Sequence, residues 1–193
     1  MSSLTPDTPL DGYNRIFNGL SITESSGVEI VSIAIANGQA LNFLKRAKKI
    51  IGTAPPSPGR WEKTKSDGRI LWTGQNHYML FHKVTNDRLD EDLFQKFKEL
   101  AYLTLQTDGW ATIDVSGERV HDVFERFIPL DLANKHVGFG TRTSAHHMSV
   151  FILKLSDMAY QLLTPRSSCS AFLKALESVI ESIIESVQYE QSS

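Results

Sequence analysis

One pattern of strands and helices occurs twice in this chain of 193 residues. In Val31–Phe81 and again in Ala111–Leu163, a strand pattern turns at a small polar residue and a glycine into an amphipathic helix, and a hairpin of two short strands follows. The glycine is Gly38 in the first copy and Gly117 in the second. A second helix pattern closes each copy. The repeat therefore predicts an α+β fold in which duplicated β-α-β-β-α units form one compact domain with pseudo-twofold symmetry.

The same pattern suggests where the chain divides. Residues 1–27 are polar and contain prolines and glycines, so we expect an extended N-terminal arm with little core of its own. Residues 28–187 are expected to form a single pseudo-symmetric domain, with halves at about 28–106 and 107–187. Residues 188–193 form a short polar tail.

Apolar residues at helical spacing predict the helices. They cover Gln39–Ile51, Asp90–Leu103, Gly117–Ile128 and about Ser168–Val187.

The segment Gly52–Gly68 contains three prolines, so we expect a loop without regular secondary structure. Arg60 and Trp61 in this loop are candidates for a contact with a partner protein, because tryptophan is enriched at interface hot spots. The alternative is that Trp61 folds back on its own domain.

Composition excludes several classes of partner and site. A net charge of −2 and a pI of about 6.3 give no strong field that would attract nucleic acid or an anionic membrane, so neither is an expected partner. Cys169 is the single cysteine, which excludes an internal disulfide and a cysteine-rich zinc site. It is expected in the first turn of the last helix, where a thiol is either activated or simply inert. The sequence shows no secretory signal and no spanning apolar run, so we expect a cytoplasmic protein.

Motifs for cofactors and metals are missing from the sequence. No Gly-x-Gly-x-x-Gly follows a strand pattern, and Gly138-Phe139-Gly140 is better explained as a turn. His146 and His147 on a strand would point to opposite faces, as would His77 and His82 at the two ends of another strand. We therefore predict no metal site, no catalytic residue and no cofactor bound by this chain.

Asp114 and Arg119 are the strongest candidates for ligand contacts. A carboxylate on a central strand is costly unless it is paired or binds something. Asp114 could accept hydrogen bonds from a pterin ring in a folate-binding module, with Arg119 beside it at the start of the following helix. The alternative is a capping role or an internal ion pair between the two side chains.

The segment Gly109–Leu176 carries a resemblance to a known protein family. The segments Ala111–Ser116, Phe127–Leu132 and Tyr160–Ser167 resemble the gamma subunit of heterotetrameric sarcosine oxidase, and Ile70–Leu80 upstream resembles the tryptophan–glycine hairpin of that family. The likeness covers roughly Gly52–Glu177. This chain departs from the family at two places. Ile128 stands where the family often has cysteine, and Gln75-Asn76 forms a hairpin turn that in the family often carries an acidic residue.

The resemblance implies a fold like the folate-binding fold of the glycine-cleavage aminomethyltransferase. It implies a non-catalytic subunit that assembles with alpha, beta and delta subunits. That assembly oxidatively demethylates sarcosine to glycine, producing hydrogen peroxide and formaldehyde or methylene-tetrahydrofolate. FAD, FMN, NAD, tetrahydrofolate and zinc would then belong to the partner subunits, and Asp114 and Arg119 would be vestigial folate contacts.

Two other functions remain open at this point. The chain could be a free-standing folate-binding protein of the aminomethyltransferase-like superfamily. It could also be a structural or interaction protein unrelated to one-carbon chemistry. Binding of tetrahydrofolate, or co-purification with flavin-containing chains, would separate these hypotheses.

Overall fold

The computed structural model describes residues 8–83 and 89–191, which form two compact units. The first unit contains Gly27–Thr107 together with Gly138–Thr141. The second contains the residues up to Ser26, Asp108–Val137 and the residues from Arg142 onward. Each unit combines an antiparallel sheet with two α-helices, so the predicted α+β class is confirmed.

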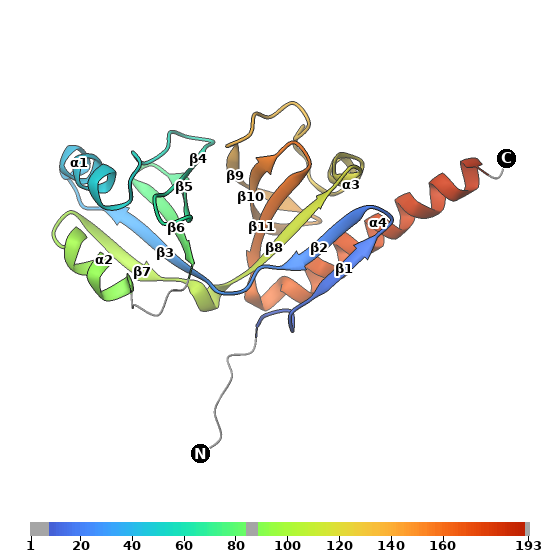
Figure 1. Cartoon of the computed structure of the whole chain (residues 1–193), viewed down its shortest axis with the longest axis horizontal. Coiled ribbons are helices and arrows are strands. Elements are labelled where there is room, and N and C mark those ends of the chain that lie inside the picture. Colours follow the sequence, from blue (N-terminus) through green and yellow to red (C-terminus); the bar gives the residue numbers. More distant parts are fainter. Residues whose placement is uncertain (1–7, 84–88, 192–193) are drawn as a thin grey trace, which may run out of the picture. The chain divides into compact units, whose positions relative to one another are not determined.

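The first unit has a five-stranded sheet in the order β4-β5-β6-β3-β7, and α1 and α2 cover one of its faces (Figure 1). Phe43 of α1 stacks on the ring of Tyr78 and contacts the ring of Phe97, so one aromatic side chain joins both helices to the sheet. The elements of this unit are β3 (Val28–Ile35), α1 (Ala40–Ile50), β4 (Trp61–Lys63), β5 (Arg69–Gly74), β6 (His77–Lys83), α2 (Leu89–Phe97) and β7 (Ala101–Leu105).

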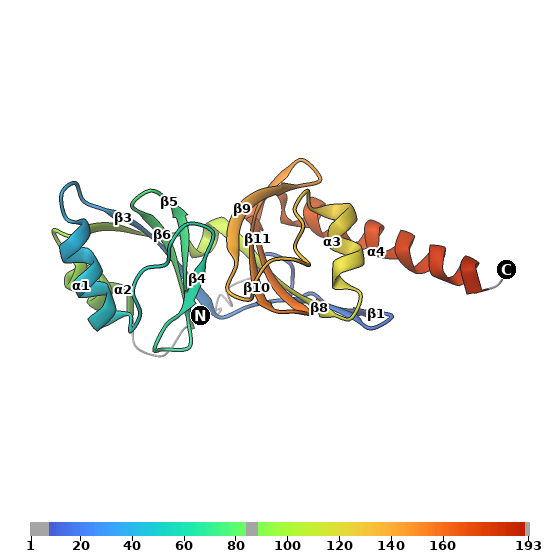
Figure 2. The same cartoon turned by 90° about the horizontal axis from the view of Figure 1, so that it is seen from above.

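The second unit has a six-stranded sheet in the order β1-β2-β8-β11-β10-β9. Phe124 packs edge-on against Tyr160 of the sheet, and Phe127 packs edge-on against Phe172, which brings α3 and α4 together on one face (Figure 2). The elements here are β1 (Asn14–Phe17), β2 (Leu20–Glu24), β8 (Trp110–Gly117), α3 (Val120–Phe127), β9 (Gly140–Ala145), β10 (Met148–Ser156), β11 (Ala159–Pro165) and α4 (Cys169–Gln191). Short 3-10 helices, η1 (Thr107–Gly109) and η2 (Arg166–Ser168), precede β8 and α4.

Both predicted hairpins are present, as β5–β6 and β10–β11. Three of the predicted helices are present, as α1, α3 and α4. α4 continues to Gln191, so the predicted polar tail over 188–193 is wrong as far as residue 191.

The predicted helix Asp90–Leu103 is wrong in its second half. α2 ends at Phe97, where the Leu100 amide donates to the Phe97 carbonyl and Glu99 takes a positive φ of 68°. The chain then becomes β7, which pairs antiparallel with β3 from Val31 to Ile35. The helical spacing of apolar residues is overridden because β3 offers an open edge whose backbone groups need partners.

The predicted polar arm over residues 1–27 is wrong from residue 14 to residue 24. These residues form β1 and β2, and β2 pairs antiparallel with β8. Leu20 and Ile22 are fully buried, because they alternate onto the face of the sheet that packs against the core. Tyr13, which precedes β1, and Arg15, which lies in β1, both donate to one carboxylate oxygen of Glu177 on α4, at 2.5 and 2.6 Å. Residues 1–7 lie outside the described part of the chain.

The loop Gly52–Gly68 also contains structure that was not expected. Trp61–Lys63 forms β4, which pairs with β5. Arg60 forms an antiparallel bridge with Phe139, and Gly140 begins β9. Gly138-Phe139-Gly140 therefore takes part in strand pairing and does not form only the expected turn. The prolines are compatible with this arrangement because they all precede the strand.

The two sheets share part of their strand order. The sequence β4-β5-β6-β3 in the first sheet corresponds to β9-β10-β11-β8 in the second, and in both a further antiparallel strand follows (β7 and β2). This is the arrangement that a duplicated unit would produce. The pseudo-twofold relation between the units stays a prediction, as does the single domain that it implies.

Candidate functional site

Asp114 and Arg119 do not form the ion pair that the sequence left open. Asp114 on β8 lies across from Gln161 on β11, and the Gln161 side-chain amide donates to the Asp114 carboxylate at 2.7 Å. Arg119 precedes α3 and pairs instead with Asp122, with 3.0 Å between Nε and Oδ2. Asp114 thus has its partner on a neighbouring strand and Arg119 has its partner in the first turn of α3, and a folate contact from either residue stays a prediction.

Trp61 is half-buried and packs within the first unit. The guanidinium of Arg69 lies 5.7 Å from the centre of the Trp61 ring, a cation–π contact. The Trp61 amide donates to the Gly138 carbonyl, and the Arg60 carbonyl accepts from Trp72. The backbone of this predicted interface segment is therefore held in place, while the Arg60 side chain is exposed. Its contact with a partner stays a prediction.

The histidines do not form a metal site. His146 and His147 lie in the turn between β9 and β10 with positive φ angles of 46° and 66°, so their predicted placement on a strand is wrong. Asn and His tolerate this backbone better than bulky residues do. Within residues 8–83 and 89–191, no three His, Cys, Asp or Glu side chains gather closely enough to hold a metal ion.

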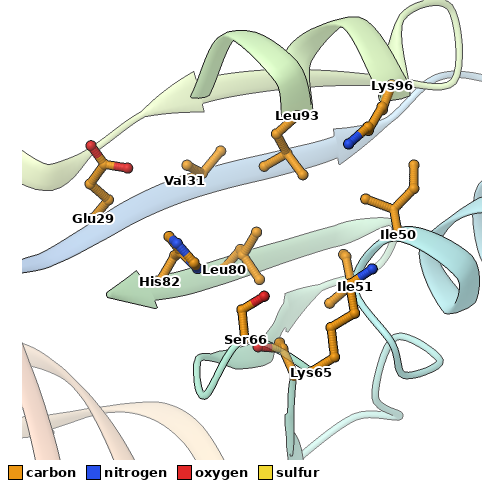
Figure 3. A pocket seen from close by; sticks show the side chains of 11 residues that line it. Glu29, Val31, Ile50, Ile51, Lys65, Ser66, Leu80, His82, Leu93 and Lys96 are labelled. Atoms are coloured by element: carbon orange, nitrogen blue, oxygen red, sulfur yellow. The ribbon is translucent and has the colours of Figure 1, made fainter. Parts of the chain in front are cut away.

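A cavity of about 110 Å³, counted as space open to the centre of a water molecule, lies in the first unit between the sheet and its helices. A single water needs only about 10–15 Å³ by this measure, so a small organic molecule fits. Five aliphatic side chains form most of its wall, and Lys65 and Ser66 are exposed where it opens (Figure 3). The lining residues are Glu29, Val31, Ile50, Ile51, Thr64, Lys65, Ser66, Leu80, His82, Leu93 and Lys96.

His82 is the unusual group in this wall. Its side chain is buried, at 8% exposed, and its Nε2 has no hydrogen-bond partner. A buried polar atom without a partner costs about 1–3 kcal/mol of folding free energy. Burial lowers the pKa of the imidazole, and the nearby Glu29 carboxylate opposes that effect. The ring is therefore neutral at pH 7, with a nitrogen that is able to donate or accept.

The sheet register places polar groups at one end of the cavity. Glu29 on β3 and His82 on β6 are direct cross-strand partners, and the next pair on the same face is Val31 and Leu80. Figure 3 shows Glu29 and His82 at one end, with the Glu29 carboxylate pointing away from the imidazole, whereas Lys65 and Lys96 lie at the Ile50–Ile51 end. The cavity is thus apolar in the middle and polar at both ends.

Sequence reasoning missed this site. It considered His82 only as a possible metal ligand together with His77, and it gave Glu29 no role. The two residues are 53 positions apart, and only the register of β3 against β6 brings them together. The available signal was weaker: Tyr78, Leu80 and His82 alternate along one strand, which places the histidine on the apolar face.

Comparison with known proteins shows similarity in structure but none in sequence. No family model matches the chain, and no curated protein resembles it in sequence. A chain of the heterotetrameric sarcosine oxidase from Corynebacterium sp. U-96 has the same fold, with a TM-score of 0.78 and 14% identity over 91% of this chain and 94% of that chain. The resemblance in fold that the sequence predicted is confirmed.

The glycine cleavage system aminomethyltransferase T from Bartonella henselae is also similar. The TM-score is 0.65 with 10% identity over 82% of this chain. The chain spans only 45% of that protein's length. The aminomethyltransferase-like fold is therefore shared with part of a larger chain.

Proposed function

We propose that this chain is a non-catalytic subunit of a hetero-oligomeric oxidase like heterotetrameric sarcosine oxidase. The observation that carries the proposal is the extent of the match, since 91% of this chain corresponds to 94% of one chain of that oxidase. A match over nearly all of both chains supports equivalence to a complete subunit. The match to the aminomethyltransferase covers only part of that protein and supports the fold alone.

In this proposal the chain assembles with alpha, beta and delta subunits in the cytoplasm. FAD, FMN, NAD, tetrahydrofolate and zinc belong to those partners. The assembly oxidatively demethylates sarcosine, giving glycine and hydrogen peroxide with formaldehyde or methylene-tetrahydrofolate. Flavins supply the chemistry of hydride removal, and this chain contributes packing surface. In the described part of the chain, no helix is both long and apolar enough to cross a bilayer.

Arg60 and Trp61 are the proposed contact with a partner subunit. The backbone around them is held by β4 and by the bridge to Phe139, so the exposed Arg60 side chain projects from an ordered segment. Such preorganisation lowers the entropy lost on binding.

Affinity purification of the tagged chain from its native cells tests the proposal. We expect larger chains in the eluate, flavin absorbance, and peroxide formation when sarcosine is added. Arg60→Glu should reduce recovery of the partners, whereas Lys48→Glu on the exposed face of α1 should not. A stable chain recovered alone, without flavin or sarcosine turnover, would contradict the proposal.

A free-standing folate-binding protein is the second candidate, and the aminomethyltransferase-like fold is compatible with it. It predicts that the isolated chain binds tetrahydrofolate in calorimetry. Asp114→Asn keeps an oxygen that accepts from Gln161 but removes the charge, so it should weaken binding while the exposed Glu118→Gln does not. Absence of heat with the wild-type chain would exclude this function.

A further inference from the structure

The cavity in the first unit lies beside the best-packed part of that unit. Val31, Leu80 and Leu93 belong to the main cluster of buried residues and also line the cavity. Protein interiors contain few spaces larger than a water molecule. A space of about 110 Å³ beside the exposed Lys65 and Ser66 is several times what one water needs, and it is large enough only for a molecule of a few heavy atoms.

His82 makes the cavity more than a packing defect. The imidazole is buried, and its Nε2 lacks a partner within the protein. Figure 3 shows the ring on the cavity wall beside Glu29. Nε2 itself has almost no accessible surface, so the contact that the cavity offers a bound molecule is with the other atoms of the ring.

The spacing of the charges constrains that molecule. Glu29 and His82 form one cross-strand pair, and Val31 and Leu80 form the next pair on the same face, about 7 Å further along the sheet. Lys96 lies at the opposite end, and Lys65 lies at the opening. An α-amino acid carries its amine and carboxylate on one carbon and cannot span these ends. A short aliphatic chain with a charge at each end can.

We propose that this cavity binds a short aliphatic ω-amino carboxylate. Its methylene chain lies against Val31, Leu80 and Leu93, and its amine lies between Glu29 and His82. The carboxylate lies at the end lined by Lys96 and Lys65. The site belongs to this chain alone and does not depend on the proposed assembly.

Calorimetry and NMR on the full chain test the site with 5-aminovalerate as the probe. Valerate and pentylamine are the matched compounds that lack one charged end. We expect 5-aminovalerate to bind at least tenfold more tightly than either compound, and to shift the His82 ring resonances.

Two variants locate the binding. His82→Leu should weaken 5-aminovalerate binding about tenfold, which equals about 1.4 kcal/mol. His77→Leu, at the exposed start of the same strand, is the control and should bind as the wild type does. If His82→Leu does not fold, the shift of the His82 resonances in the wild-type chain decides the question.

The proposal is overturned if none of the compounds binds, or if binding leaves the His82 resonances unchanged. Equal affinity for valerate and 5-aminovalerate would also overturn it, because the Glu29–His82 end would then have no part in recognition. None of these results bears on whether the chain assembles with flavin-containing partners.

Discussion

Two buried side chains, Glu24 in the second unit and His82 in the first, show two ways in which this chain buries a polar group. In the second unit, Glu24 is 7% exposed and its carboxylate accepts hydrogen bonds from Thr8, Leu10 and Gly12, at 2.8, 2.9 and 2.8 Å. In the first unit, His82 is equally buried, but its Nε2 has no partner.

Lys154 extends the contrast. Its side chain is 1% exposed, and the ammonium donates to the carbonyls of Leu132, Ala133 and Lys135 at 3.3, 3.2 and 2.8 Å. Burial of a charge is tolerated where hydrogen bonds replace water. The buried charges of Glu24 and Lys154 therefore fix neighbouring segments, whereas the buried His82 ring lines a cavity. The difference separates structural groups from a candidate binding group.

The largest expected loss of stability is at one of the two glycines that precede the helices of the repeated pattern. Gly117 has a φ of 144°, and a Cβ there would lie 2.1 Å from the Gly19 carbonyl oxygen, whereas Gly38 has a φ of 73° and open space around it. Gly117→Ala should therefore lower the free energy of unfolding by at least about 3 kcal/mol, and Gly38→Ala by about 1 kcal/mol. Urea denaturation measures both. Equal losses would mean that the close strand approach at Gly117 does not form.

Removal of the Lys154 ammonium is the next largest change. Lys154→Met keeps most of the packing but leaves three carbonyls without their donor. We expect a loss of about 3 kcal/mol in the free energy of unfolding. Lys174→Met, on the exposed face of α4, is the control and should change stability by less than about 0.5 kcal/mol. A neutral Lys154→Met would show that the buried ammonium stabilises nothing.

Glu24→Gln should have a smaller effect. The amide retains one acceptor oxygen but directs an NH2 group at donors that the carboxylate bound. A loss of about 2 kcal/mol is expected, together with faster proteolysis of the segment before β1. Glu181→Gln, exposed on α4, serves as the matched control. Unchanged protease sensitivity would argue that Glu24 does not anchor this segment.

The smallest expected effect is the pH dependence contributed by His82. Burial places its folded-state pKa below the ordinary value of 6.5, while Glu29 opposes the shift. The unfolded state then binds more protons, so stability is complete above pH 6.5 and falls as the pH drops below that value. Stability curves of the wild type and His82→Gln should diverge below pH 6.5, with the wild type losing more. Parallel curves would indicate that the imidazole is not buried in solution.

Much of the architecture follows from local sequence. Three of the helices and both hairpins were predicted because apolar periodicity and turn residues are local signals. The errors share a cause. Ala101–Leu105 and Leu20–Glu24 are strands because β3 and β8, which lie far away in sequence, present open edges to them. Local propensity cannot report which distant edge needs a partner.

The candidate sites show the same division. The sequence identified Asp114, Arg119 and Trp61 as residues of interest, but their partners Gln161, Asp122 and Arg69 emerged only from the structure. The sequence by itself determined the α+β class and the apolar faces, since these depend on neighbours along the chain. The predicted β-α-β-β-α order missed the strand that follows the first helix of each unit, β4 and β9. Tertiary structure alone decided the pairing of Glu29 with His82 and the cavity beside them, because strand register is set by contacts between distant segments.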